Sequence, residues 1–313
     1  MRAAQFDRLG PPEVLHVVDV AVPEPRPDEV VVRVAAAGLN PADLSVRSRV
    51  RSYGAPITFP VRPGWDLAGE IVALGSGISD WAVGDQVFGL AGFPDPAGTH
   101  AEFAAVPGSQ LAPRPAGLSD TESGALPLVG LTVLQAYAYA GGIKAGERVF
   151  IDAAAGGVGH VAVQVAKASD AVVVGTATQA KHDFVRGLGV DEAVDYTTVR
   201  DPYAAAGPLD LILSSRSSAS IQQAIAALRP GGRLVSIVGA VDEEARAAAA
   251  RHGVQADNMI VHPDAAGLRE LASLVDRGLL TVTVGQVWNL EDIRKAHEAM
   301  ESGRAVGKIA LVP

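Results

Sequence analysis

The sequence predicts an α/β fold in which a doubly wound parallel sheet is joined to a second, mainly β domain of barrel-like form. From Val149 onward, short apolar runs alternate with helical patterns, which is the order that produces a parallel sheet covered by helices. Before Pro107, short strand patterns follow one another through turns rich in glycine and proline. The chain has 313 residues, of which 48% are hydrophobic and 19% are charged, so it can form two domains with separate cores.

The first third of the chain contains mostly strand patterns. Alternating valines at 30–34 indicate a strand with one buried face. Asn40 can cap a short helix that begins at Pro41. We expect His100 to lie on the surface of a strand; the alternative is that it faces the cleft. The other strands expected here are Met1–Phe6, Val14–Val20, Leu67–Leu74, Gln86–Leu90 and His100–Val106.

The remainder of the chain combines helices with buried strands. Ser119 and Glu122 have the spacing of a capping box, and the helix that follows is expected to run to about Ala140. A later helix is expected from Asn289, as its cap, to Ser302. The expected strands are Val149–Ile151, Ala171–Gly175, Glu192–Asp195, Leu209–Ser214, Arg233–Val238, Asn258–Val261 and Lys308–Val312.

We expect the chain to leave the β domain and to return to it near its C-terminal end. Residues 1–119 and 265–313 are assigned to the β domain, and residues 120–264 to the domain with the parallel sheet. The alternation of strands and helices predicts the sheet directly. The return is an expectation that goes beyond this pattern.

The stretch Arg148–Lys167 has the order strand, small-residue turn, helix. Ala154, Gly156 and Gly159 occupy the three positions of the G-x-G-x-x-G motif, with alanine in place of the first glycine. Small residues there let a pyrophosphate approach bare backbone N–H groups at a helix N-terminus. The alternative is a small-residue turn without a ligand. The predicted cofactor-binding residues of this turn are Ala154, Gly156, Gly157, Val158 and Gly159.

The end of the strand Ala171–Gly175 bears on which nicotinamide cofactor is used. An NAD-specific site usually places an acidic residue there for the ribose 2′-hydroxyl. This chain has Thr176, Thr178 and Lys181 and no carboxylate in that stretch. Because a 2′-phosphate needs donors and a cation, the sequence predicts NADPH as the cofactor. The alternative is that the three residues form only a solvated helix start.

Composition and charge exclude several other functions. The formal net charge of −9 argues against a nucleic-acid or anionic-membrane partner, because no basic patch offsets it. No apolar run is long enough to span a membrane, and the first residues lack a secretory signal pattern, so we expect a cytoplasmic protein. The absence of cysteine excludes disulfides, thiolate nucleophiles and zinc sites built on thiolates, and no histidine spacing supports a metal site.

Several segments match the motifs of one protein family in the same order. They are Ala36–Asp43, Pro63–Leu90, Leu126–Tyr137, Ala153–Lys167, Leu228–Gly239, Asn258–Leu268 and Glu301–Val312. Together they cover essentially the whole chain. They resemble the zinc-independent quinone oxidoreductase, or zeta-crystallin-like, branch of the medium-chain dehydrogenase/reductases.

The resemblance implies a GroES-like β domain, a Rossmann domain and an active site in the cleft between them. It implies NADPH, a homodimer, and a small-molecule quinone or enone as substrate, although the loops that shape the cleft do not name that substrate. These loops are Arg47–Phe59 and Phe93–Gly98.

The resemblance also implies roles for individual residues. Asn40 would donate a hydrogen bond to a substrate oxygen, or it only caps its helix. Tyr53 would donate a proton over the cleft, or it only forms a wall. Thr132 would lie against the nicotinamide, or its hydroxyl bonds back to its own helix turn. Val238 is expected to contact the cofactor.

Two departures from family patterns matter. Zinc-dependent members of the superfamily have a cysteine near the position of Asn40 and Gly-His-Glu where this sequence has Gly64-Trp65-Asp66, so metal-activated alcohol oxidation is not expected. Relatives read Asp-x-Val-Gly-Gly where this chain has Ser214–Ser218, which either reshapes the rim over the cofactor ribose or adds a cation near a phosphate.

The expected function is zinc-free hydride transfer from NADPH to a quinone or an α,β-unsaturated carbonyl. Conjugation in such a substrate spreads the charge that hydride brings, so the protein mainly orients it and donates a hydrogen bond. Two alternatives remain at this point. One is an NADPH-binding protein with a structural or sensor role, and the other is a pathway-specific enoyl reductase.

Overall fold

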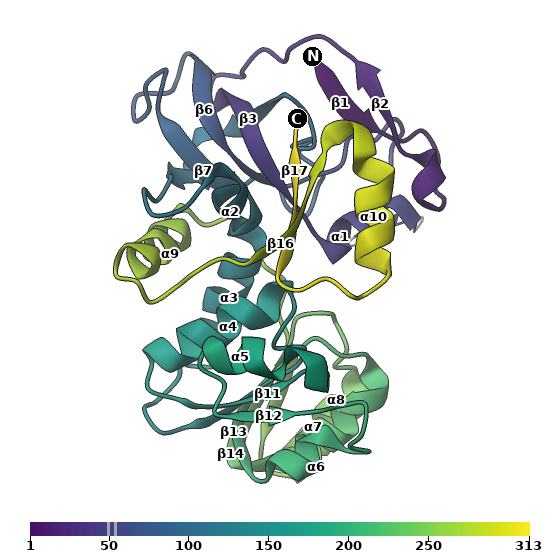
Figure 1. Cartoon of the computed structure of the whole chain (residues 1–313), viewed down its shortest axis with the longest axis vertical. Helices are drawn as coiled ribbons and strands as arrows, with labels where there is room; N and C mark the ends of the chain where they lie inside the picture. The colour runs from purple at the N-terminus through teal and green to yellow at the C-terminus, as the bar shows by residue number, and fades with distance from the viewer. Residues whose placement is uncertain (49–50, 53–54) are drawn as a thin grey trace. The chain divides into compact units, whose positions relative to one another are not determined.

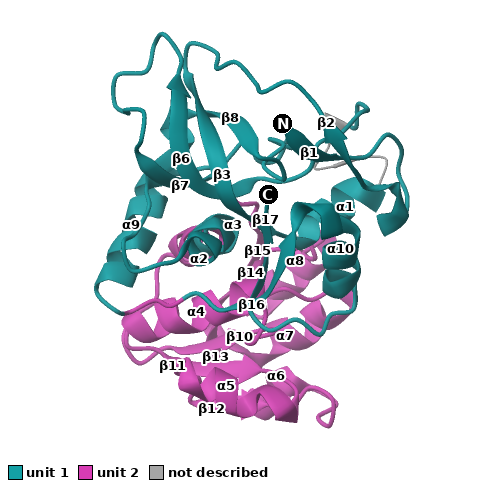
Figure 2. Cartoon of the chain, turned by 45° about the horizontal axis from the view of Figure 1, so that its top comes forward, with its two compact units in different colours: residues 1–131, 262–278, 282–313 teal, residues 132–261, 279–281 magenta. Residues whose placement is uncertain are grey.

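The computed structural model describes residues 1–48, 51–52 and 55–313, and this part of the chain divides into two compact units. Unit 1 comprises Met1–Leu131, His262–Gly278 and Val282–Pro313, and unit 2 comprises Thr132–Val261 and Leu279–Thr281 (Figure 2). The predicted domain boundaries, after residues 119 and 264, stay predictions beside this division. None of the helices formed by the described residues is long and apolar enough to cross a membrane.

Unit 2 is built on a six-stranded parallel sheet (Figure 1). Its strands lie in the order β12, β11, β10, β13, β14, β15, so the chain winds outward in both directions from the pair β10–β13. This is the strand order of a doubly wound dinucleotide-binding sheet, and it confirms the predicted fold class. The strands are β10 (Arg148–Ile151), β11 (Val172–Thr176), β12 (Glu192–Val194), β13 (Leu209–Ser214), β14 (Leu228–Ser236) and β15 (Gln255–Asn258).

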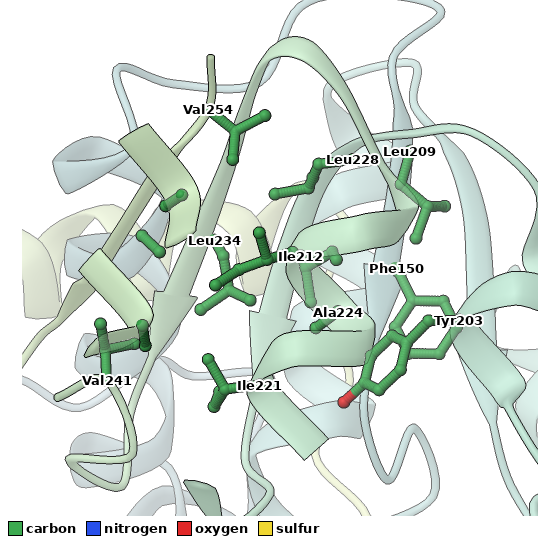
Figure 3. Close-up of a cluster of buried hydrophobic side chains, with 14 of the residues drawn as sticks. Phe150, Tyr203, Leu209, Ile212, Ile221, Ala224, Leu228, Leu234, Val241 and Val254 are labelled. Atoms are coloured by element: carbon green, nitrogen blue, oxygen red, sulfur yellow. The ribbon is translucent and has the colours of Figure 1, made fainter. Parts of the chain in front are cut away.

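One face of this sheet is covered by three helices that share a buried apolar cluster (Figure 3). Phe150 of β10 and Ile212 of β13 pack there with Tyr203, whose ring centroid lies 4.7 Å from that of Phe150. The strands carry apolar residues because this face is sealed from water. The three helices are α6 (Pro202–Ala206), α7 (Ile221–Ala227) and α8 (Glu243–Arg251). The other helices of unit 2 are α4 (Gly157–Ala168) and α5 (His182–Gly187), while α3 (Pro127–Tyr139) begins in unit 1 and continues into unit 2.

Unit 1 contains a seven-stranded sheet that is mostly antiparallel. Its centre is β3 (Glu29–Leu39), which pairs with β8 through residues 29–33 and with β17 through residues 37–39. The other edge of β3 pairs with β6. Because one edge of β3 changes its partner along its length, the sheet curls around an apolar core. The other strands of this sheet are β6 (Asp66–Leu74), β7 (Gln86–Leu90), β8 (Phe103–Pro107), β9 (Leu111–Pro113), β16 (Val284–Asn289) and β17 (Lys308–Val312).

Smaller elements complete unit 1. Two short antiparallel pairs are formed by β1 (Arg2–Gln5) with β2 (His16–Asp19) and by β4 (Arg51–Ser52) with β5 (Ala55–Pro56). The α-helices are α1 (Pro41–Ser48), α2 (Asp120–Ala125), α9 (Ala265–Asp276) and α10 (Ile293–Glu301). The 3-10 helices of the two units are η1 (Pro12–Val14), η2 (Gly108–Gln110), η3 (Gln179–Lys181), η4 (Ser218–Ser220) and η5 (Leu290–Asp292).

Several expected boundaries differ from the structure. The capping box at Ser119 is confirmed, but its helix ends at Ala125, and α3 starts at Pro127. The break falls there because proline lacks an N–H and is best accepted at the first helical position. The last parallel strand, β15, begins three residues before the predicted range 258–261 and ends at Asn258. Ala256 is buried on the sheet, while Ile260 beyond the strand is 61% exposed.

Candidate functional site

The turn after β10 is held by hydrogen bonds from its own backbone. The N–H of Ala153 donates to Thr176 Oγ1 over 2.8 Å, and the N–H of Ala154 donates to the Thr176 carbonyl over 2.9 Å. Thr176 is 1% exposed, and its hydroxyl oxygen accepts a hydrogen bond that shapes this turn. The residue that the sequence assigned to a 2′-phosphate therefore holds the motif turn against the end of β11.

The same turn leads into the N-terminus of α4. Gly156 is the N-cap of α4 and has no side chain that could accept a hydrogen bond from the first N–H groups of the helix. A Cβ on Gly159 would lie 2.2 Å from the carbonyl oxygen of Ala153, so the turn and the helix can approach this closely only with glycine. Gly157 and Val158 form the first helical turn. This cradle fits the pyrophosphate of a dinucleotide.

The cradle lies at the point where the strand order of the sheet reverses. Asp152 follows β10 and is 3% exposed, and its Oδ2 accepts hydrogen bonds from the hydroxyls of Ser214 and Tyr203, both over 2.9 Å. Ser214 ends β13, so this carboxylate joins the two strands on either side of the reversal. Burial raises the pKa of Asp152. Ligands of doubly wound sheets bind at this place, at the carboxyl ends of the strands.

The residues after β11 form a short 3-10 turn. Thr178 precedes this turn and Lys181 ends it. Asp195, which follows β12, brings a carboxylate to the same turn, because its Oδ2 accepts the Gln179 N–H over 3.3 Å. Its Oδ1 accepts the N–H and the hydroxyl of Thr197. The turn after β11 contains no acidic residue. Because β12 pairs beside β11, Asp195 just after β12 brings a carboxylate to this turn.

Val238 lies on the loop that follows β14 and is 55% exposed. Its N–H donates to Ser236 Oγ over 3.4 Å, and Ser236 is the register partner of Ser214. Val238 therefore follows a strand end at the same edge of the sheet as the motif turn.

In unit 1, Asn40 lies in a fully buried polar cluster. Its side-chain nitrogen donates to Asp66 Oδ2 over 2.9 Å and to the Gly38 carbonyl over 3.3 Å. Its side-chain oxygen accepts a hydrogen bond from Lys308 Nζ, which also donates to the Leu39 carbonyl over 3.0 Å. The side chain therefore does not cap α1 as expected, and both of its amide hydrogens are used within unit 1.

Two carboxylates complete this cluster. One oxygen of Asp43 accepts the Asn40 backbone N–H over 2.9 Å and the other accepts the Gly64 N–H over 3.1 Å. The second oxygen of Asp66 accepts the Leu128 N–H over 2.7 Å. Asn40, Asp43, Asp66 and Lys308, here called the Asn40 cluster, thus tie together β3, α1, β6 and β17.

The electrostatics of the Asn40 cluster follow from its burial. Desolvation raises the pKa of Asp43 to about 7 and that of Asp66 to about 6, although the charge of Lys308 opposes both shifts. Desolvation also lowers the pKa of Lys308. His100, expected on a strand surface, is 1% exposed, and burial lowers its pKa to about 4. It is neutral near pH 7, with Nε2 3.4 Å from the Gly38 carbonyl oxygen.

Unit 1 also contains a pocket of about 520 Å³. Residues from the segments 57–62 and 95–98 line it together with Val46 of α1. These segments overlap the two loops that the sequence assigned to substrate selection. Tyr53 lies outside the described residues. Thr132 lies on α3 and is 5% exposed.

Comparisons with known proteins agree with this architecture. A family model described as the alcohol dehydrogenase GroES-like domain matches residues 26–116, and one described as a zinc-binding dehydrogenase matches residues 188–311. The quinone-oxidoreductase homolog of Spinacia oleracea chloroplasts is 40% identical over 204 residues, which is 63% of this chain and 62% of that relative. The chloroplast envelope quinone oxidoreductase homolog of Arabidopsis thaliana is 30% identical and covers 100% of this chain and 98% of its own.

Solved structures give the same result over the full length. The quinone oxidoreductase from Coxiella burnetii is 31% identical, with a TM-score of 0.92 and coverage of 100% of this chain and 99% of its own. The Escherichia coli quinone oxidoreductase complexed with NADPH is 26% identical, with a TM-score of 0.89 and full coverage of both chains. The CurK enoyl reductase is 28% identical, with a TM-score of 0.85 and coverage of 99% and 98%.

The two units and the cradle at the strand reversal define a medium-chain dehydrogenase/reductase, an oxidoreductase that uses NADH or NADPH. Within that superfamily the chain belongs to the zinc-independent quinone oxidoreductase branch, as the motifs predicted.

The residues of this chain do not fit the zinc named in one family description. The chain has no cysteine. Among the described residues, no three histidine, aspartate or glutamate side chains gather in a metal-binding arrangement. Trp65, at the position of the histidine in Gly-His-Glu, is fully buried and donates its indole N–H to the Asp95 carbonyl over 2.9 Å.

Proposed function

We propose that this protein is an NADPH-dependent, zinc-free reductase that transfers hydride to a quinone or an α,β-unsaturated carbonyl. The observation that carries the proposal is the bare cradle of Gly156 and Gly159 at the strand reversal of unit 2, in a family member without cysteine. Its relatives include quinone oxidoreductases and an enoyl reductase, which supports this substrate class.

The chemistry divides between cofactor and protein. When bound, the reduced nicotinamide supplies a hydride, and one further proton from solvent balances the conversion of a quinone to a hydroquinone. The cradle of unit 2 holds the pyrophosphate with backbone N–H groups. Asn40, Tyr53 and Thr132 stay predictions as catalytic residues. A direct bond from Asn40 to substrate requires that its bond to Gly38 or Asp66 be released.

The preference for NADPH is supported by Thr178 and Lys181 beside the end of β11. Lys181→Ala is expected to weaken NADPH binding much more than NADH binding, because only NADPH carries the 2′-phosphate. Fluorescence titration of both cofactors measures this, and an equal loss for both would reject the assignment. Tighter binding of NADH than of NADPH by the unaltered protein would instead make Asp195 the acceptor for the ribose hydroxyl.

Activity is tested by absorbance at the reduced-nicotinamide band, with each cofactor and a panel of quinones and enones. We expect NADPH, and not NADH, to be oxidised with a quinone. Turnover only with an enoyl thioester would favour the enoyl reductase that CurK exemplifies. Cofactor binding with no turnover would favour a binding protein with a structural or sensor role.

We also propose that the protein is a homodimer. β15 is the outermost strand on one side of the described sheet of unit 2, and Ile260 just beyond it is 61% exposed. An exposed strand edge beside an apolar side chain is a common association surface. Light scattering should give twice the chain mass, and a monomer mass at micromolar concentration would contradict this. A cytoplasmic location stays a prediction.

A further inference from the structure

The pocket of unit 1 combines apolar walls with two charged side chains. Val46 and Val61 are 1% and 7% exposed and supply apolar surface. Arg62 and Asp95 also line the pocket, and both are exposed. Such a lining suits a molecule with an apolar body and a charged end.

The backbone around Arg62 is fixed on both sides. Val61 exchanges two hydrogen bonds with Phe6, over 2.9 and 3.0 Å, and the carbonyl of Pro63 accepts the His100 N–H over 3.2 Å. These bonds fix where the Arg62 side chain leaves the backbone at the pocket wall.

The facing wall is shaped to receive the stem of Arg62. Gly98 has a φ of +71°, which favours glycine, and a Cβ built on it would lie 3.3 Å from Arg62 Cβ. Any larger residue at 98 would press on the arginine. The segment 95–98 therefore approaches Arg62 closely, although Arg62 as a whole is an exposed residue.

Within the described part of the chain, the Arg62 guanidinium forms no ion pair, and Asp95 is not paired with it. A ligand anion would therefore not have to displace a protein carboxylate. The protein as a whole carries a formal charge of −9, which repels anions, so a local cation is what allows one to bind.

We propose that this pocket binds the substrate and that Arg62 selects quinones or enones that carry a carboxylate on an apolar body. The inference rests on the proposed function and adds the substrate class. The planar guanidinium accepts a carboxylate through two parallel hydrogen bonds, which a neutral amide cannot match. Asp95 disfavours a second anionic group on the same substrate.

The test compares a benzoquinone with a propanoate side chain and the same quinone with a propanamide side chain. The methylenes insulate the ring, so the two differ in charge and hardly in reactivity. We expect the unaltered protein to prefer the acid in kcat/KM, with the difference mainly in KM. Arg62→Gln should reduce the acid-to-amide ratio by roughly five- to tenfold, the value of one charge-assisted contact near the surface. Asp95→Asn should increase that ratio.

The matched control is Arg277→Gln, which removes an exposed positive charge from α9's C-terminal end and does not touch the pocket lining. The acid-to-amide ratio of kcat/KM in this control should equal that of the unaltered protein. An equal effect of Arg62→Gln on both quinones, or a preference of the unaltered protein for the amide, would overturn the proposal.

Calorimetric binding of the two quinones, measured without turnover, separates this proposal from the reductase function. If neither quinone is reduced but the acid still binds more tightly in an Arg62-dependent way, the reductase proposal fails and the anion site stands. If both quinones are reduced without any Arg62-dependent preference, the reductase proposal stands and the anion site is rejected.

Discussion

Lys308→Met removes the cation from the Asn40 cluster, and we expect it to destabilise unit 1 strongly. Lys308 Nζ donates to the Leu39 carbonyl and to Asn40 Oδ1, and it lies 3.5 Å from Asp66 Oδ2. Asp66 is fully buried, so the substitution leaves a carboxylate without its counter-charge and two acceptors without a donor. Breaking one partner of a buried pair costs about 3–5 kcal/mol, which is the loss we expect at pH 8.

The loss should depend on pH, and its sign follows from Asp66. Its pKa is already raised to about 6 with Lys308 beside it, and loss of that charge raises it further. A carboxyl with a raised folded pKa contributes stability at low pH that is lost as the pH rises through that pKa. The variant therefore regains stability between pH 8 and pH 5, where Asp66 takes up a proton. Asp43 acts in the same direction, because its pKa is raised to about 7 and loss of the Lys308 charge raises it further. The pKa of His100 is lowered to about 4 by burial, and this residue is present in both proteins. Its contribution therefore largely cancels when the unfolding free energies of the two proteins are subtracted.

The assay is urea unfolding followed by tryptophan fluorescence. All three tryptophans, Trp65, Trp81 and Trp288, belong to unit 1, so the signal reports this unit. We expect the destabilisation at pH 5 to be about half of that at pH 8. Adding Asp66→Asn to the variant should recover part of the loss at pH 8. An equal loss at both pH values, with no recovery in the double variant, would refute the electrostatic reasoning.

Two further predictions concern unit 2. Gly159→Ala should weaken NADPH binding by roughly tenfold, because the new Cβ must displace the Ala153 carbonyl, while Gly187→Ala, with open space around it, serves as the control in the same fluorescence titration. Binding unchanged by Gly159→Ala would contradict the cradle. Asp152→Ala leaves the hydroxyls of Tyr203 and Ser214 without their acceptor and should lower the free energy of unfolding by roughly 2–4 kcal/mol in circular dichroism. A smaller loss is expected for Asp152→Asn, which keeps an acceptor oxygen, and equal losses for the two variants would show that the acceptor is not what matters.

Much of the fold was predictable because it depends on local patterns. The neighbouring strands β10 and β11 of unit 2 carry short apolar runs, and the motif turn is recognisable by its small residues between strand and helix. The capping box at Ser119 was also readable, since both of its partners lie within one helical turn. Where prediction was wrong, as for the helix divided before Pro127, one residue inside an otherwise continuous apolar pattern decided the outcome.

The polar contacts of the site were less predictable, because long-range pairing creates them. Asn40 and Lys308 are 268 positions apart in sequence, and the antiparallel pairing of β3 with β17 brings them together. Asp195 reaches the turn after β11 only because β12 pairs beside that strand. Neither contact has a local sequence signal. The one available sequence signal for the buried cluster was a lysine at the start of an apolar strand, Lys308–Val312.

At the departure Ser214–Ser218, a carboxylate lies against the end of β13 although the motif's own aspartate is missing. The resemblance implies an aspartate at the end of the strand that contains Leu209, and this chain has Ser214 there. The carboxylate of Asp152 instead comes from β10, 2.9 Å from Ser214 Oγ, so an acid still joins the strands at the point of reversal. Oδ2 of Asp152 also accepts a hydrogen bond from the hydroxyl of Tyr203 on α6. Oδ1 of Asp152 has no hydrogen-bond partner among the described residues. A comparison at Ser214 alone therefore misses the carboxylate that Asp152 places against the end of β13.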